Sequence, residues 1–144
     1  MTERTIRQII DGQDLLTAPS SMTVADAARL MKQRNVGAMM VVDDGRLAGV
    51  FTERDGLFRV LAAGLDGATT PLSAVMTANP RTISPDRSFA HALGFMHEGR
   101  FRHLPVVEDG RPIGMISVRD ALGPELEAFV YEMLRQEQVS QILA

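Results

Sequence analysis

Two short segments of the chain place a carboxylate three residues after a hydroxyl. They are Thr52-Glu53-Arg54-Asp55 and Ser117-Val118-Arg119-Asp120, and each follows an apolar stretch. A carboxylate fixed at a strand-to-helix turn can accept hydrogen bonds from both vicinal hydroxyls of a ribose, and the free N–H groups at a helix start favour an anion such as phosphate. The same spacing also forms a capping box, which only closes the helix N-terminus. The two interpretations are compatible, because a cap can also bind.

These segments belong to an internal repeat. A gapless shift of 65 residues lays Thr17–Asp55 onto Thr82–Asp120 with 12 identities in 39 positions, where chance gives about two or three. The identities concentrate in Val41-Val42-x-Asp44-Gly45-Arg46-x-x-Gly49-x-x-x-x-Arg54-Asp55 and its copy. The chain therefore contains two copies of one supersecondary unit.

Each copy is predicted to be a β-α-β-β-α unit, so the fold class is α+β (α/β). Apolar residues at helical spacing begin near Val24 in the first copy and near Phe89 in the second. The apolar runs Ala38–Val42 and Leu104–Val107 have strand length, and each leads into Asp-Gly, which signals a tight hairpin. The hairpins would return along Leu47–Phe51 and Ile113–Ile116, with short leading strands near Leu16–Ala18 and Thr82–Ile83.

The segments between and after the copies set the domain boundaries. Residues Ala63–Pro71 are rich in Gly and Thr and indicate a linker, and Pro71–Met76 could start a short helix. We therefore expect one domain over residues 1–68 and a second over 69–144. Pro124 is predicted to begin a new C-terminal helix, which packs on its own domain or contacts another molecule. Its apolar stripe is Leu126, Phe129, Val130, Met133 and Leu134.

Taken together, these motifs resemble the CBS (cystathionine β-synthase) domain family, in particular the tandem pair called a Bateman module. The resemblance covers most of the chain and rests on Gly49–Asp55, Gly114–Asp120, the lead-in Val75–Asp86 and Phe101–Val107. Each motif is weak alone, but their order, spacing and duplication are specific. The resemblance implies two units packed sheet to sheet about a pseudo-twofold axis. It also implies two clefts, where members of the family bind AMP, ATP, ADP, NAD(H) or S-adenosylmethionine.

Basic residues near the two segments are candidates for contacting phosphate. Arg54 and Arg119 stand at matching positions, where they could neutralise phosphate or pair at the surface with Glu53 and other carboxylates. The resemblance suggests that Arg102 and His103 face a cleft and touch phosphate. The alternatives are a solvated surface charge for Arg102 and a satisfied, partly buried histidine for His103.

The first copy has small residues where the second has Arg102 and His103. Gly37 and Ala38 would leave room for a purine against their backbone, so unequal clefts are expected. The family holds the base through backbone groups at the positions of Thr82 and Ile83. The expected ligand-binding residues are Asp120, Ser117, Arg119, Asp55, Thr52, Arg54, Arg102, His103, Gly37, Ala38, Thr82 and Ile83.

Composition argues against several other classes of protein. The absence of cysteine excludes a thiol nucleophile, a Cys-ligated zinc and a disulfide framework, and it fits a reducing compartment. No apolar run approaches membrane-spanning length and no leader is apparent, so we expect a soluble, cytoplasmic protein. A net charge of −3 with interspersed signs, and only six Phe, one Tyr and no Trp, argue against nucleic acid as a partner.

Catalysis and metal binding are also not expected. His91, His97 and His103 are six residues apart, which does not align three ligands on one helical face. No P-loop, nucleophile elbow or nucleophile–base constellation appears, so we expect neither a metal, nor a cofactor, nor an enzyme. Turnover of an offered nucleotide would overturn that expectation.

The sequence therefore predicts a stand-alone regulatory module that binds an adenine nucleotide and signals by a conformational or oligomeric change. The alternative is a ligand-independent scaffold that dimerises or holds a partner protein, with vestigial clefts. A homodimer is the expected assembly, with a further protein target left open. Residue types alone leave the particular adenosyl ligand and the number of occupied clefts undetermined.

Overall fold

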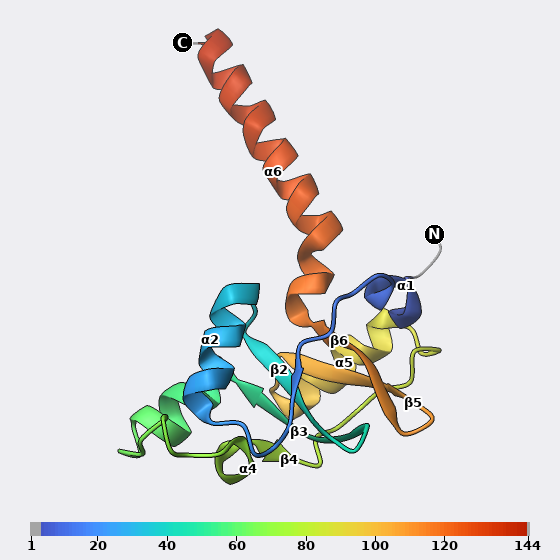
Figure 1. The fold of residues 1–144 in the computed structure, drawn as a ribbon. Coiled ribbons are helices and arrows are strands. Elements are labelled where there is room, and N and C mark those ends of the chain that lie inside the picture. The colour runs from blue at the N-terminus through green and yellow to red at the C-terminus, as the bar shows by residue number, and fades with distance from the viewer. Residues whose placement is uncertain (1–3, 144) are drawn as a thin grey trace.

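The computed structural model describes residues 4–143, which form two similar α+β units and a long C-terminal helix (Figure 1). The first unit holds a four-stranded sheet in the order β1-β2-β3-β4, and the second a two-stranded sheet of β5 and β6. The strands are β1 Thr17–Ala18, β2 Ala38–Asp43, β3 Arg46–Thr52, β4 Thr77–Ala78, β5 His103–Glu108 and β6 Arg111–Ser117. The predicted fold class and the tandem repeat are confirmed.

Both predicted hairpins form, and they share one register. Val41 faces Gly49 in the first hairpin and Val106 faces Gly114 in the second, with a shift just after each pair. Both turns are Asp-Gly pairs with positive φ, at 52° and 75° for Asp44 and Gly45, as a two-residue hairpin turn requires. The leading strand differs between units: β1 pairs in parallel with β2, whereas Ile83 contributes a single parallel bridge to Val106.

The long helices of the two units begin and end in the same way. Thr23 caps α2 and Ser88 caps α5, each accepting from an N–H three residues on, and both helices close on a left-handed residue, Asn35 or Arg100. Each helix buries its apolar stripe in the core of its own unit. The helical segments are α1 Ile6–Ile10, α2 Val24–Arg34, α3 Glu53–Asp55, η1 Gly56–Leu61 (a π-helix), α4 Leu72–Val75, α5 Phe89–Gly99 and α6 Val118–Leu143.

Each short helix that precedes a unit packs on the other unit. Ile6 and Ile10 of α1 lie in the core of the second unit, and Leu72 and Val75 of α4 lie in the core of the first. Matching bridges anchor these segments, with Thr5 on Ser88 and Thr23 on Pro71. The exchange ties the units together, while the boundary predicted between residues 68 and 69 stays a prediction.

The duplicated glycines Gly49 and Gly114 allow the exchanged segments to approach closely. A Cβ at Gly49 would lie 2.6 Å from Met76 Sδ and 2.8 Å from the Thr77 carbonyl oxygen, and one at Gly114 would lie 2.7 Å from Ile10 Cγ2. No real side chain tolerates such contacts without movement of its neighbours. These glycines are therefore required by packing rather than by an unusual backbone conformation.

The C-terminal helix differs from the prediction. Pro124 does not begin a new helix, because α6 runs without a break from Val118 to Leu143. It leaves the body of the protein along most of its length (Figure 1). Met133 and Leu134 are exposed, at 47% and 56%, whereas the side chains of Leu126, Phe129 and Val130 lie outside the described residues. In the part of the chain that the structure covers, no helix is both long enough and apolar enough to cross a membrane.

Candidate functional site

The two hydroxyl–carboxylate segments lie where β3 and β6 end and the next helices begin. The first N–H group of each helix donates back to the residue ahead of the hairpin, from Glu53 to the Gly37 carbonyl at 2.9 Å and from Val118 to the Arg102 carbonyl at 3.1 Å. The structure thus brings Gly37 beside Thr52–Asp55 and Arg102 beside Ser117–Asp120. Both pairings follow from the hairpin register.

In the first unit the segment is a complete capping box. The Thr52 N–H donates to Asp55 Oδ2 at 3.0 Å, and the Asp55 N–H donates to Thr52 Oγ1 at 3.2 Å. The other carboxylate oxygen, Oδ1, lies 3.5 Å from Nε of Arg59. Asp55 is only 9% exposed. Both of its oxygens are engaged within the protein.

In the second unit the aspartate is held by one oxygen. The Ser117 N–H donates to Asp120 Oδ2 at 2.7 Å, and the Ser117 hydroxyl lies 3.5 Å from the same oxygen. Asp120 is half-buried, and no residue that the structure describes donates to its Oδ1. This carboxylate is oriented by the chain and keeps accepting capacity, which is what recognition of vicinal hydroxyls needs.

Charged side chains of both units influence the titration of His103. Burial lowers the pKa of His103 below its usual value, and the positive charges of Arg102 and Arg119 lower it further, while Glu53 and Asp120 act in the opposite direction. Glu53 belongs to the first unit, and the other four residues belong to the second. The neutral imidazole therefore sits in a polar cluster to which both repeats contribute.

The space over Gly37 differs from the expectation. A Cβ at this position would meet Glu53 Oε1 at 3.1 Å, so the Glu53 carboxylate covers the glycine. Ala38 is buried, with 8% exposed. The small residues accommodate Glu53 in this structure, and a purine contact at Gly37 and Ala38 requires that side chain to move.

The remaining candidates are less closely grouped. Arg54 does not pair with Glu53, and its guanidinium lies 5.5 Å from the Phe58 ring centroid. The Ile83 N–H donates to the Pro105 carbonyl at 3.0 Å and its carbonyl accepts from Val107 at 3.0 Å, so its backbone is used within the sheet.

Two cavities, each about 290 Å³, lie at the hairpin end of the units. Thr82 lines one of them, beside Arg46 and Val107, and the two Asp-Gly-Arg turns line the other. Strands of this length extend roughly 20 Å, so neither cavity coincides with the Asp120 end of β6. Among the described residues, no three His, Cys, Asp or Glu side chains gather as metal ligands.

Two contributions to the site escaped the sequence analysis. Glu53 was considered only as a surface partner of Arg54, yet it acts on His103 across the repeat boundary. Arg4 was not considered, yet its Nη2 donates to the Asp120 carbonyl oxygen at 3.0 Å. The sequence offered one weak indication of an N-terminal helix beside Arg4, because Thr5-x-x-Gln8 has the spacing of a capping box ahead of apolar residues.

Comparison with known proteins gives the family. The family model for the CBS domain matches the chain twice, over residues 6–61 and 72–124. The chain belongs to the CBS domain family. CBS domain-containing protein YhcV of Bacillus subtilis is 38% identical over 104 residues, which are 72% of this chain and 74% of YhcV.

Two further relatives support the assignment to CBS domains. CBS domain-containing protein CBSCBSPB3 of Arabidopsis thaliana is 40% identical over 121 residues, and the matched part is 83% of this chain but 22% of that protein. This chain therefore spans about a fifth of the length of such plant relatives. A solved protein with CBS domains from Burkholderia ambifaria superposes with a TM-score of 0.80 at 33% identity, covering 86% of this chain and 95% of the other.

Two solved CBS proteins of similar fold carry ligands. One, from Pyrobaculum aerophilum, is complexed with AMP and has a TM-score of 0.74 at 23% identity. The other is a CBS domain pair in complex with 5′-methylthioadenosine and S-adenosyl-L-methionine, with a TM-score of 0.74 at 24% identity. At these identities the likeness establishes the shared fold. Tandem CBS domains are regulatory modules.

Proposed function

We propose that this CBS pair binds an adenosyl ligand at the end of β6 and that binding regulates a partner or an assembly. The observation that carries the proposal is the state of Asp120: one carboxylate oxygen is anchored by Ser117, while Oδ1 has no donor among the described residues. A carboxylate oriented in this way can accept from the two hydroxyls of a ribose.

The neighbouring charges suit the rest of such a ligand. Arg102 and Arg119 act on His103 together with Asp120, so a 5′-phosphate placed beside the ribose would lie among cationic groups. The carboxylate of Glu53 carries the opposite charge to the two arginines, so it disfavours a ligand with a high negative charge. AMP or S-adenosylmethionine therefore fits the cluster better than ATP.

Signalling follows from the composition of the cluster. Because Glu53 comes from one repeat and Asp120 from the other, a ligand that contacts both favours one relative arrangement of the repeats. That arrangement is also held by the exchanged helices α1 and α4, so a change at the cluster can spread through the pair.

Calorimetric titration with AMP, ATP, NADH and S-adenosylmethionine tests the proposal. Saturable binding at micromolar concentration, lost in Asp120→Ala, is the expected result. If none of the four compounds binds to the wild-type protein, the proposal is overturned.

A ligand-independent scaffold is the second candidate, and the observation that favours it is the exposed apolar surface of α6. Tyr131, Leu134 and Ile142 are 70%, 56% and 81% exposed, and large exposed apolar groups mark contact sites. Truncation after Gly123 followed by light scattering separates the candidates. If the protein dimerises without nucleotide and the truncated chain does not, the scaffold is supported. If truncation leaves the oligomeric state unchanged, α6 has no assembly role.

A further inference from the structure

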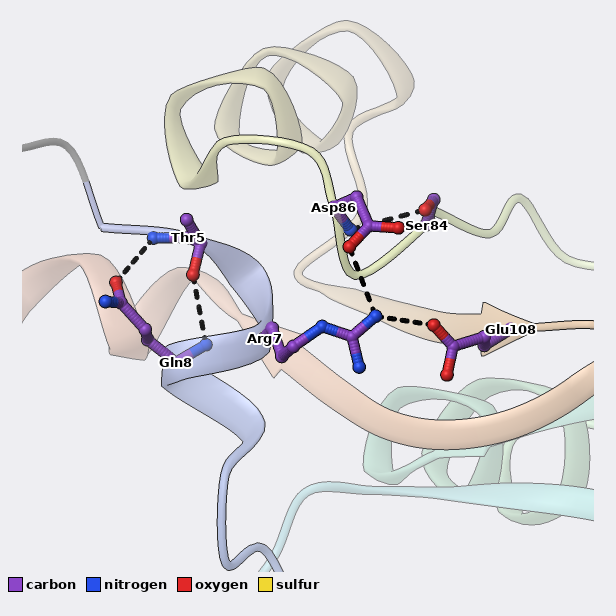
Figure 2. A network of polar contacts seen from close by, with 6 residues as sticks. All are labelled: Thr5, Arg7, Gln8, Ser84, Asp86 and Glu108. Carbon is purple, nitrogen blue, oxygen red and sulfur yellow. Dashed lines mark hydrogen bonds and ion pairs between the residues drawn. The ribbon is translucent and has the colours of Figure 1, made fainter.

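The N-terminal segment, residues 4–13, docks on the second unit next to the proposed ligand site. Ile6 and Ile10 are buried in its core, at 0% and 7% exposed. Figure 2 shows Arg7 reaching from α1 to two carboxylates, Asp86 Oδ1 at 3.1 Å and Glu108 Oε2 at 2.5 Å. These contacts hold the segment on the second unit in addition to the contacts of Arg4.

Arg4 makes a different kind of contact. Its Nη2 donates to the backbone carbonyl of Asp120 at 3.0 Å, and its guanidinium carbon lies 5.2 Å from the Phe89 ring centroid. The Phe89 N–H donates to the Arg4 carbonyl at 3.1 Å. The Arg4 side chain is therefore fixed at its base and along its length before it reaches Asp120.

The carbonyl that Arg4 contacts lacks the regular backbone donor of an α-helix. In an α-helix the Asp120 carbonyl accepts from the N–H of the residue four positions on, and that residue is Pro124, which has no N–H. A partly buried carbonyl without a donor is costly. The guanidinium of Arg4 supplies the missing donor from 116 residues away.

We propose that Arg4 is a positioning residue for the ligand site of the second repeat. By bonding the Asp120 carbonyl it fixes the first turn of α6, and with it the direction of the Asp120 carboxylate. The inference rests on the proposed function, because it assigns the N-terminal segment to the same site. The first repeat differs: Arg59, at the position of Pro124, has a backbone N–H, and its side chain contacts the Asp55 carboxylate.

Arg4→Gln and Arg7→Gln form a matched pair for the test. Both variants remove one guanidinium from the docked segment, but only Arg4→Gln loses the bond to Asp120. Titration with AMP and with S-adenosylmethionine is expected to give about three- to tenfold weaker binding for Arg4→Gln. Arg7→Gln should keep the wild-type affinity, and Arg4→Lys should recover part of it. Equal affinities of the Arg4→Gln and wild-type proteins would overturn the proposal.

Pro124→Ala tests whether Arg4 acts through the Asp120 carbonyl or only by stabilising the fold. The alanine restores an N–H opposite the Asp120 carbonyl, so the loss of affinity caused by Arg4→Gln should shrink in the Pro124→Ala background. An undiminished loss in that background contradicts the proposed mechanism.

Hydrogen exchange separates this inference from the proposed function. If the wild-type protein binds none of the four compounds, the proposed function fails, and backbone exchange over residues 118–123 in the ligand-free protein decides the role of Arg4. Faster exchange in Arg4→Gln than in Arg7→Gln supports a fixed turn. Equal exchange in the two variants overturns it.

Discussion

The two repeats use one motif for different purposes. In the first, Thr52 and Asp55 complete a capping box, Arg59 takes the second carboxylate oxygen, and the aspartate is buried. In the second, Ser117 holds one oxygen of Asp120, and Arg4 holds the backbone instead of the carboxylate. An arginine stabilises both turns, but only the second arrangement leaves the carboxylate able to accept from a ligand. Identical residues at duplicated positions therefore need not have identical roles.

The largest expected effect tests this difference directly. Asp120→Ala should weaken AMP binding about a hundredfold, because the oriented bonds to the ribose are lost. Asp55→Ala should instead lower the free energy of unfolding by about 2 kcal/mol, because a buried cap is removed, with affinity nearly unchanged. Titration calorimetry and urea denaturation measure the two quantities. Equal losses of affinity would show that the repeats are equivalent after all.

The duplicated glycines should respond in the same direction with different severity. Gly49→Ala is expected to lower the free energy of unfolding by about 2.5 kcal/mol and Gly114→Ala by about 1.5 kcal/mol. A Cβ at Gly49 meets a backbone carbonyl as well as Met76, whereas the nearest atoms to a Cβ at Gly114 belong to the flexible side chain of Ile10.

The matched control is a second substitution, at Ile10, that makes room for a Cβ at Gly114. Because Ile10 is itself buried, the double variant Ile10→Ala/Gly114→Ala should lose less stability than the sum of the two single losses, as measured by urea denaturation. Strictly additive losses would mean that the glycine is needed for some reason other than this contact.

A smaller effect concerns the outer edges of β3 and β6. In the first repeat β4 pairs with β3, with Val50 opposite Thr77. In the second, the side-chain amide of Gln13 bonds the outer edge of β6, accepting from the Met115 N–H and donating to the Met115 carbonyl, both at 2.8 Å. Gln13→Ala should lower the free energy of unfolding by about 1 kcal/mol. Asp11→Ala, in the same exposed segment, should change little, and a matching loss there would contradict this role for Gln13.

The smallest effect is a pH dependence confined to the second repeat, since Ala38 replaces His103 in the first. Burial lowers the pKa of His103 in the folded protein, so the unfolded chain binds the proton more readily. Stability should therefore fall as the pH drops from the unfolded pKa of about 6.5 toward the lower folded value. Denaturation at several pH values should show a flatter profile for His103→Gln than for the wild-type protein, and an unchanged profile would contradict this role of His103.

Features set by neighbours along the chain were predictable. The Asp-Gly turns, the hairpins and the helices α2, α5 and α4 follow from periodicity and turn chemistry, and the duplication at 65 residues identified the repeat. The predicted capping box also forms at Thr52 and Asp55. The break expected at Pro124 was wrong because a proline within a helix can be tolerated when another donor, here Arg4, satisfies the freed carbonyl.

The sequence by itself determined the two repeats, their hairpins and the residues that carry the carboxylates, because these depend on hydrogen bonds and spacings within a few residues. Only the tertiary structure decided which aspartate has both carboxylate oxygens bonded within the protein, which helix packs on which repeat, and that Arg4 contacts Asp120 and Glu53 influences His103. Arg4 and Asp120 are 116 residues apart. Contacts over such separations arise from packing of whole elements, and no local pattern in the chain records them.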